Sequence, residues 1–447
     1  MRGVDQPDMA DHSDNHRLFI PTVPTTYTLE LTSHCNNACV GCGNVFSRDF
    51  GEMPMERWRV LLDSLRPHLF NIRVSGGEPT LHRHFPQIIA AIDRLGVPFV
   101  LFSNGVWRNR HGIVRLLLDC HNLDGILISL HGSDSLAHRQ FAGRDSFDET
   151  VQSIREATQA GLLVNTNTVL TRANFCDIEE IAQLSLDLGS GFVAFSRYYG
   201  APTPVTTLSD DELIQAVESV HALKARGAPV RFNNNIPACF SGFPSKSCPA
   251  GITHCTIDPF GNVRPCNHVP ITFGNLFDQS IKEMWDSEQA RQWRNLIPQA
   301  CYQCAEFDRC RGGCKAMALH SHNEQDPLMR QPLAEELPRD GPRKLTLYEE
   351  AKPVKNFRMR REDFGLLLVN RSRVLPVSFA AEPLLDALDG VHSLRAIERQ
   401  FGQEGVNFVG QLYTEGLVRL TNGTSDDQPD RPHPLDPYPC GDNFSDL

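Results

Sequence analysis

Cysteine is the residue type in this chain best placed to do chemistry, with fourteen copies in 447 residues. Three of them, Cys35, Cys39 and Cys42, stand in Thr-Ser-His-Cys-Asn-Asn-Ala-Cys-Val-Gly-Cys. Eight more gather in the second half of the chain: Cys239, Cys248, Cys255, Cys266, Cys301, Cys304, Cys310 and Cys314. The first 18 residues hold no apolar export segment, so we expect the chain to work in the reducing cytosol. The cysteines therefore indicate metal ligation or catalysis rather than disulfides.

Charge and hydropathy narrow the range of partners. Asp and Glu total 54 against 43 for Lys and Arg, a formal charge of −11, which argues against nucleic acid as a partner. Apolar runs fall far short of the ~20 residues that cross a bilayer, which argues against a membrane partner.

The elements that must position the first three cysteines come from an α/β pattern. Short β-rich runs alternate with longer amphipathic stretches, and this pattern predicts a parallel sheet. Six right-handed crossovers curl such a sheet into a partial (β/α)6 barrel similar to a TIM barrel. The expected strands cover residues 27–31, 72–75, 99–103, 126–130, 163–169 and 192–195, and helical patterns include 56–65, 84–95, 147–160, 178–188 and 210–225.

Composition predicts the further parts of the chain. Residues 23–238 form the barrel, and 239–330 shift to Cys, Gly, Pro and aromatic residues, which indicates a domain organised around metal. A proline-rich, charged stretch over 331–360 predicts a linker. Residues 361–421 predict a small α+β domain of winged-helix type, with strands at 364–369 and 374–379 and helices at 381–388, 393–401 and 406–415. The tails 1–22 and 422–447 are expected to be disordered.

Polar and glycine residues follow the second, third and fourth predicted strands and also lie within the fifth, so we expect them to reach the carboxyl edge, where barrel active sites form. Three thiolates there satisfy three irons of a cubane cluster and leave the fourth iron open to another ligand. Gly76 and Gly77 let backbone approach a small ligand closely, and Glu78 offers a carboxylate to its ammonium group. The other candidates at this edge are Pro79, Ser103, Asn104, Ser129 and Asn167.

Cys-x3-Cys-x2-Cys after the first strand, with Gly-Gly-Glu-Pro after the second, resembles the radical S-adenosylmethionine (radical SAM) superfamily. The resemblance implies a [4Fe–4S] cluster on Cys35, Cys39 and Cys42 whose open iron chelates S-adenosylmethionine. Its reductive cleavage yields a 5′-deoxyadenosyl radical that abstracts hydrogen from a C–H bond. The family usually has an aromatic residue before the third cysteine, so Gly41 implies that the adenine packs elsewhere. The arginine for the carboxylate of S-adenosylmethionine is Arg139 or Arg144.

The second group of cysteines resembles the SPASM extension of radical enzymes, on Cys-x12-Gly-x4-Cys followed by Cys-x2-Cys-x5-Cys-x3-Cys. This resemblance implies two auxiliary [4Fe–4S] clusters. One takes Cys248, Cys255, Cys266 and Cys314, and the other takes Cys301, Cys304 and Cys310. The eighth ligand is Cys239 by simple counting, Cys440 in the tail, or an open iron. A structural zinc site is the plainer alternative.

The C-terminal unit resembles the peptide chaperone of pyrroloquinoline quinone biosynthesis (PqqD-like), a recognition element for ribosomally made peptides. Such elements hold a leader peptide as an added strand on a sheet edge, which assigns precursor binding to residues 361–421. A winged-helix DNA binder is the alternative, but residues 361–420 carry a net charge of −2. A purely structural cap also stays open.

These features together predict a radical SAM/SPASM oxidoreductase that installs a crosslink, thioether or oxidation in a ribosomal peptide, with a flavodoxin or ferredoxin as reductant. The alternatives are oxidation or decarboxylation of a tetrapyrrole or other small molecule, and a non-catalytic iron–sulfur electron-transfer protein.

Overall fold

The computed structural model describes residues 19–42, 51–200, 202–322, 325–338, 348–371 and 373–421. The tail predicted over 422–447, and residues 1–18 of the tail predicted at the other end, lie outside these ranges. Cys440 lies outside them too. No helix in the described part of the chain is long and apolar enough to span a membrane.

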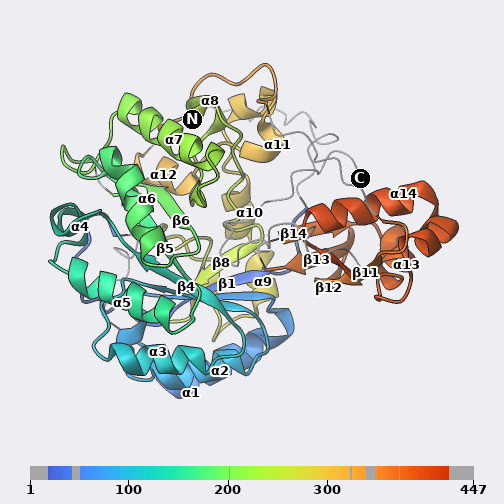
Figure 1. Ribbon diagram of the computed structural model, residues 1–447, viewed down its shortest axis with the longest axis horizontal. Helices are drawn as coiled ribbons and strands as arrows, with labels where there is room; N and C mark the ends of the chain where they lie inside the picture. The colour runs from blue at the N-terminus through green and yellow to red at the C-terminus, as the bar shows by residue number, and fades with distance from the viewer. Residues whose placement is uncertain are drawn as a thin grey trace, which may run out of the picture.

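One large sheet forms the centre of the molecule (Figure 1). Ten strands of the described residues join it in the order β10-β9-β8-β1-β2-β3-β4-β5-β6-β7. Neighbours from β1 to β7 run parallel, which confirms the predicted partial barrel. The seventh strand was not predicted, because three residues behind a proline carry too little pattern to read as a strand. The seven strands are β1 Thr26–Glu30, β2 Asn71–Ser75, β3 Phe99–Ser103, β4 Leu123–Ser129, β5 Val164–Leu170, β6 Val193–Arg197 and β7 Val230–Phe232.

Amphipathic helices cover the outer face of these strands. α1 buries Trp58, Leu61 and Leu65 against the sheet, and a capping box of Ser209 and Glu212 starts α7 where its pattern predicts. The barrel helices are α1 Met55–Leu65, α2 Phe85–Asp93, α3 Arg110–Leu118, α4 Ser135–Ala142, α5 Phe147–Gln159, α6 Ile178–Asp187 and α7 Asp210–Ala225, with 3-10 turns η2 Arg66–His68, η3 Pro79–Leu81 and η4 Phe175–Asp177.

The cysteine-rich part continues the barrel sheet. β8 (His254–Ile257) runs parallel to β1 on the side opposite β2, so Cys255 pairs in register with Tyr27. β9 (Asn262–Arg264) and β10 (Gly274–Asn275) follow antiparallel, after a turn in which Gly261 has φ +90°. The helices here are α8 Ala238–Ser241, α9 Ile281–Trp285, α10 Glu288–Arg294, α11 Phe307–Cys310 and α12 Lys315–His320, with the 3-10 turn η5 Gln299–Gln303.

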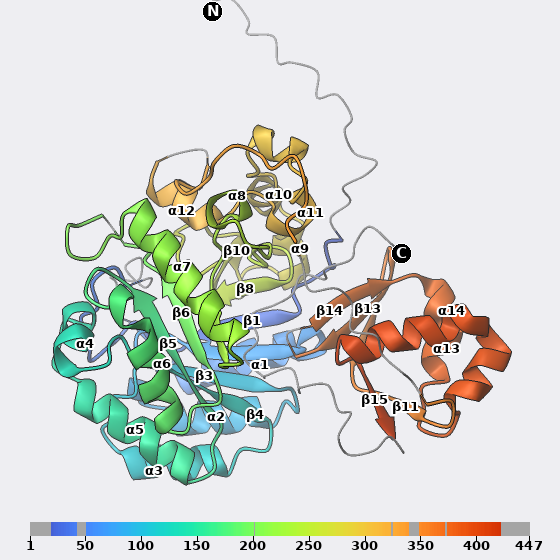
Figure 2. The same cartoon turned by 45° about the horizontal axis from the view of Figure 1, so that its top comes forward.

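The C-terminal element has a three-stranded antiparallel sheet, β12-β13-β14, with helices on one face, and a separate antiparallel pair, β11-β15 (Figure 2). Two of its strands were expected, and Gly402 breaks the last helix near the expected gap between two helices. β11 and most of β12 lie inside the segment predicted as a linker, where charged residues and Pro353 mask short edge strands. The elements are β11 Lys352–Lys355, β12 Arg358–Glu362, β13 Gly365–Asn370, β14 Arg373–Val377, η6 Phe379–Ala381, α13 Glu382–Asp386, α14 Leu394–Thr414 and β15 Val418–Thr421.

This small sheet is docked on the barrel. Leu366 and Leu368 of β13 face the helices of the element, while Leu367 and Val369 pack with Phe70 at the start of β2. Arg360 donates to the Val23 carbonyl (2.8 Å), and Arg371 pairs with Asp124 of β4 (2.9 Å). Val23 and Phe70 precede β1 and β2, and Asp124 is the second residue of β4. The element therefore contacts the amino edge of the barrel, and both faces of its sheet are covered, which explains the apolar run Leu-Leu-Leu-Val.

Candidate functional site

The loop that carries Cys35, Cys39 and Cys42 leaves β1 at the carboxyl edge of the barrel, as predicted. Two short backbone hydrogen bonds hold it to the loop after β2: Gly77 N donates to Thr32 O and Glu78 N donates to His34 O, both at 2.7 Å. A Cβ on Gly77 would stand 2.2 Å from the His34 carbonyl oxygen, and one on Gly76 would stand 2.6 Å from that of Thr32. Both positions therefore require glycine so that the cysteine loop can approach.

Glu78 is fully buried and points to neighbouring loops. Its carboxylate accepts hydrogen bonds from Ser103 Oγ (3.0 Å to each oxygen), Asn104 N (2.8 Å) and Thr80 Oγ1 (2.6 Å). Burial raises the pKa of Glu78, and these donors oppose that shift. The structure thus gives Glu78 protein donors, in contrast to the ligand ammonium group that the sequence suggested. Pro79 begins the 3-10 turn that follows.

Asn104 connects the third strand to the cysteine loop. Its amide nitrogen lies 2.8 Å from Asn36 Oδ1 and 3.6 Å from Cys35 Sγ. Arg144 donates to the Asn36 carbonyl (3.1 Å), whereas Arg139 is exposed on α4. Of the two arginines considered for the carboxylate of S-adenosylmethionine, Arg144 is the one that contacts the cysteine loop.

The three thiols of the loop interact electrostatically, because their charges affect the pKa values of Cys35 and Cys39. Burial, followed by the charges of Cys42 and Cys35, raises the pKa of Cys39 to about 12. Burial also raises the pKa of Cys35, and the charges of Glu78 and Cys42 add to it. Bare thiolates would therefore repel one another, and a cationic iron centre would relieve the repulsion. This donor set fits an iron–sulfur cluster on the loop.

The remaining predicted barrel residues, Ser129 and Asn167, lie on two neighbouring strands. Ser129 ends β4 and pairs in register with Asn167 of β5. The Asn167 side-chain oxygen accepts from Ser196 Oγ at 2.8 Å. Polar residues of three neighbouring strands, β4, β5 and β6, therefore lie side by side towards the carboxyl end of the sheet.

The second half of the chain brings Cys239 next to three predicted ligands. Burial, then the charges of Cys310, Cys304 and Cys239, raises the pKa of Cys301 to about 12. Backbone N–H groups of Arg330 and Leu333 donate to the sulfurs of Cys239 (3.2 Å) and Cys304 (3.3 Å). The charge of Cys239 therefore acts on Cys301 together with those of Cys304 and Cys310, while its role as the eighth ligand stays a prediction.

A further set contains Cys248, Cys266 and Cys314. Burial and then the charges of Cys248 and Cys314 raise the pKa of Cys266. Cys255 lies on β8, where burial is the cause that raises the pKa of its thiol. Its membership of this set stays a prediction. In the described residues no three His, Cys, Asp or Glu side chains meet closely enough to hold a single metal ion.

Sequence reasoning missed three residues at the end of the sixth strand: Arg197, its last residue, and Tyr198 and Tyr199 directly after it. A Cβ on Gly41, which has φ +71°, would lie 2.4 Å from the Tyr198 ring, so this ring fills the space beside Gly41. Tyr199 stacks on His268 with ring centroids 4.4 Å apart, and its hydroxyl lies 3.8 Å from Cys314 Sγ. One strand end thus reaches both cysteine groups. These three residues come just after the strand predicted over 192–195, so their position at its carboxyl end was the signal by which they could have been identified.

Comparison with known proteins agrees with this geometry. The model of the radical SAM superfamily matches residues 29–185, and that of the SPASM iron–sulfur cluster-binding domain matches residues 248–311. Mycofactocin maturase MftC of Mycobacterium tuberculosis (strain CDC 1551 / Oshkosh) is 32% identical over 313 residues, covering 66% of this chain and 78% of the relative. MftC of Mycolicibacterium smegmatis is 30% identical over 326 residues, with the same two coverages of 66% and 78%.

Solved structures share the fold. Streptococcus suis SuiB bound to S-adenosylmethionine aligns with a TM-score of 0.57 and 18% identity, over 69% of this chain and 78% of that one. AnSMEcpe with bound AdoMet and the Cp18Cys peptide aligns with a TM-score of 0.55 and 18% identity, over 70% and 92%.

The fold and the two cysteine groups define an enzyme built on an iron–sulfur radical barrel. The chain belongs to the radical SAM superfamily, among the enzymes that carry a SPASM domain. Membership implies a [4Fe–4S] cluster that binds S-adenosylmethionine, and auxiliary iron–sulfur clusters in the SPASM domain.

Proposed function

We propose that this enzyme modifies a ribosomally made precursor peptide by radical chemistry at the mouth of the barrel. The observation that carries the proposal is the docking of the three-cysteine loop on Gly76, Gly77 and Glu78 by two 2.7 Å backbone hydrogen bonds. That contact fixes three thiols at the edge where a barrel exposes its active site.

Cys35, Cys39 and Cys42 would hold the cluster that binds S-adenosylmethionine. When the reduced cluster and S-adenosylmethionine are both bound, they would supply a 5′-deoxyadenosyl radical that abstracts hydrogen from the substrate. Asn104 orients the loop by donating to the Asn36 side chain, and Arg144 does so by donating to the Asn36 backbone carbonyl. Arg144 would also provide the positive charge for the carboxylate of S-adenosylmethionine.

Tyr198 would provide packing for the adenine. Its ring is half-buried, lies against Gly41 next to Cys42, and meets Phe141 edge to face at 6.4 Å. An aromatic face beside the cluster loop is a stacking surface for a purine base. The ring thus reaches from the sixth strand into the position where the resemblance implied an aromatic residue.

The cysteines of the SPASM domain would hold two auxiliary clusters. Cys239 completes the set of Cys301, Cys304 and Cys310, while Cys248, Cys255, Cys266 and Cys314 make the other set. A flavodoxin or ferredoxin of the cytosol would reduce the enzyme.

The peptide substrate is supported by the relatives and by the C-terminal element. The relatives at about 30% identity are named maturases, and SuiB has been solved with its precursor peptide SuiA. β14 is an edge strand of the C-terminal sheet, where an added peptide strand gains main-chain hydrogen bonds. Pro376 fits an edge only where its missing N–H would face outward, so the N–H of Val374, two residues earlier, also faces the open side.

Anoxic reconstitution tests the enzymatic step. With dithionite and S-adenosylmethionine the loaded enzyme should form 5′-deoxyadenosine, measured by liquid chromatography. It should also change the mass of a synthetic peptide encoded by a small reading frame beside the gene. Cleavage without any change in the peptide would favour a small-molecule substrate, and no cleavage by iron-loaded protein would refute the enzyme assignment.

A matched pair of variants tests the peptide site. Val374→Pro removes the outward N–H, while Val374→Ala keeps it and loses similar packing. One hydrogen bond is worth about 0.5–1.5 kcal/mol, so Val374→Pro should bind a fluorescent form of the peptide roughly 2–12 times more weakly than Val374→Ala. Equal binding by the two variants would exclude strand addition at β14.

A further inference from the structure

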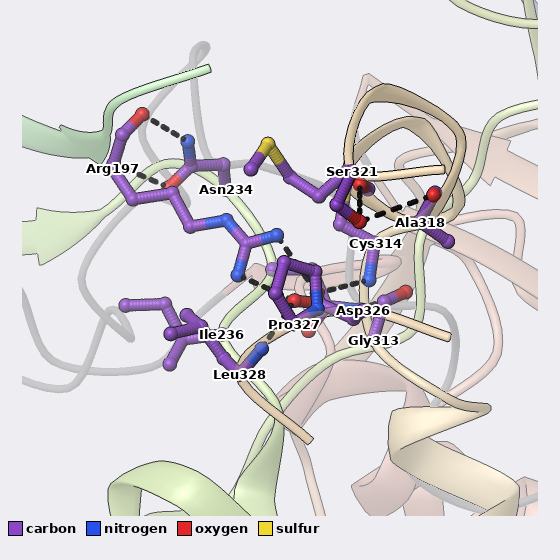
Figure 3. Close-up of polar contacts among 12 residues, drawn as sticks. Arg197, Asn234, Ile236, Gly313, Cys314, Ala318, Ser321, Asp326, Pro327 and Leu328 are labelled. Carbon is purple, nitrogen blue, oxygen red and sulfur yellow. Dashed lines mark hydrogen bonds and ion pairs between the residues drawn. The ribbon is translucent and has the colours of Figure 1, made fainter. Parts of the chain in front are cut away.

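Arg197, the last residue of β6, is bound to the cysteine-rich part by a buried ion pair (Figure 3). Its two terminal nitrogens donate to Asp326 at 2.7 and 3.2 Å, and the two side chains are 4% and 0% exposed. Asp326 also accepts the backbone N–H groups of Cys314 (2.8 Å) and Leu328 (3.0 Å). The backbone of Arg197 is fixed by Asn234, which exchanges two hydrogen bonds with it. The guanidinium therefore occupies one fixed position beside Cys314.

Two buried side-chain nitrogens near this pair have no hydrogen-bond partner among the described residues. Within the described residues, Arg197 Nε and His268 Nδ1 are buried without a hydrogen-bond partner. Tyr199 joins them, because it stacks on His268 and its hydroxyl lies 3.8 Å from Cys314 Sγ. Arg197 Nε is a buried donor without a partner, so a group with acceptor atoms at this place would satisfy it. The sulfur atoms of an iron–sulfur cluster on Cys314 are such acceptors.

The charges around Arg197 agree with a cluster on Cys314. Burial alone would lower the pKa of Arg197, but the charges of Cys314 and then Asp326 raise it. The guanidinium therefore stays positively charged beside the sulfur of a predicted cluster ligand.

We propose that Arg197 raises the reduction potential of the cluster held by Cys314 and that Asp326 holds Arg197 in position. A buried positive charge and an N–H donor both stabilise the more negative, reduced cluster. A higher potential makes this cluster a better acceptor for the one electron that the substrate radical loses when it is oxidised at the barrel mouth, where β6 also ends. The inference rests on the proposed function, since it requires the auxiliary cluster.

Potentiometric titration followed by electron paramagnetic resonance tests the proposal on the anoxically reconstituted full chain. Arg197→Gln should lower the potential of one auxiliary cluster, making its reduction at least tenfold less favourable, which is about 59 mV for one electron. Asp326→Asn should shift the same signal upward, because its amide oxygen still accepts from the guanidinium and keeps Arg197 in place while the negative charge is removed. Arg197→Lys should stay closer to the wild type, since it keeps the charge.

Arg360→Gln is the matched control, because Arg360 also pairs with a buried carboxylate, that of Glu362, but lies on the C-terminal element. Its clusters should titrate as in the wild type. Unchanged potentials in iron-loaded Arg197→Gln, or a shift of the same sign in Arg197→Gln and Asp326→Asn, would overturn the proposal. Wild-type protein that binds no iron would instead refute the proposed function.

Discussion

Moving the aromatic ring from position 198 to position 41 tests how the adenine of S-adenosylmethionine is packed. Tyr198→Ala removes the stacking surface, and base stacking is worth about 1–3 kcal/mol, so S-adenosylmethionine should bind roughly 5–150 times more weakly. Gly41→Phe alone forces a Cβ to within 2.4 Å of the Tyr198 ring at φ +71°, so it should disturb the cysteine loop. The double variant places a ring from position 41 into the space that Tyr198 vacates, at a backbone cost of about 1–2 kcal/mol.

Equilibrium binding to the reconstituted protein provides the readout, from the change that S-adenosylmethionine causes in the paramagnetic signal of the reduced cluster. The double variant should bind more tightly than either single variant. Tyr302→Ala is a control, since this exposed tyrosine lies on η5 and should leave binding unchanged. Wild-type affinity in Tyr198→Ala would show that the ring does not pack on the cofactor.

Two other predictions concern the barrel. Cys35→Ala, Cys39→Ala or Cys42→Ala should abolish formation of 5′-deoxyadenosine while the auxiliary iron, measured by metal analysis, remains; cleavage that survives any of them would place the initiating cluster elsewhere. Burial lowers the pKa of His138 from 6.5 to about 4, and its neutral ring accepts the backbone N–H of His131 (3.2 Å). As the pH falls from 6.5 towards 4, the unfolded chain gains a proton that the folded chain excludes, so the folded state should lose up to about 3 kcal/mol. His138→Gln should show a shallower fall of the melting temperature over this range, and an identical profile would refute the assignment.

Periodicity sufficed for the barrel because each strand and helix buries an apolar pattern of its own. The limits of α7 were predicted to the residue from its helical pattern, and Ser209 and Glu212 form a capping box at its start. The strands β7 and β11 were missed because each is short and lies next to or contains a proline. For such strands the tertiary pairing, rather than the local pattern, determines the structure.

Which residues belong to the site was easier to predict from the sequence than which residues they contact. Spacing identified the cysteine loop and Gly-Gly-Glu-Pro, but only the fold shows that Glu78 turns inward to Ser103 and Asn104. Asp326 carries no local signal, and its role arises from pairing with Arg197 across 129 residues of sequence. Long-range partners of this kind depend on topology, which a single sequence does not display.

The two ends of the barrel set a distance that a substrate peptide must cover. The C-terminal element contacts residues at the amino edge, such as Val23, whereas the cysteine loop lies beyond the carboxyl end of β1. The five residues of β1 span about 17 Å from the amino edge to the carboxyl edge. A peptide that runs outside the helices must also pass around a layer about 10 Å thick, which adds a similar length. An extended peptide at about 3.3 Å per residue therefore needs roughly ten residues between the segment held at β14 and the residue that is modified. Precursors with shorter spacers should still bind but stay unmodified in a mass-spectrometric assay, whereas full modification across a spacer of about three residues would mean that the peptide is captured elsewhere.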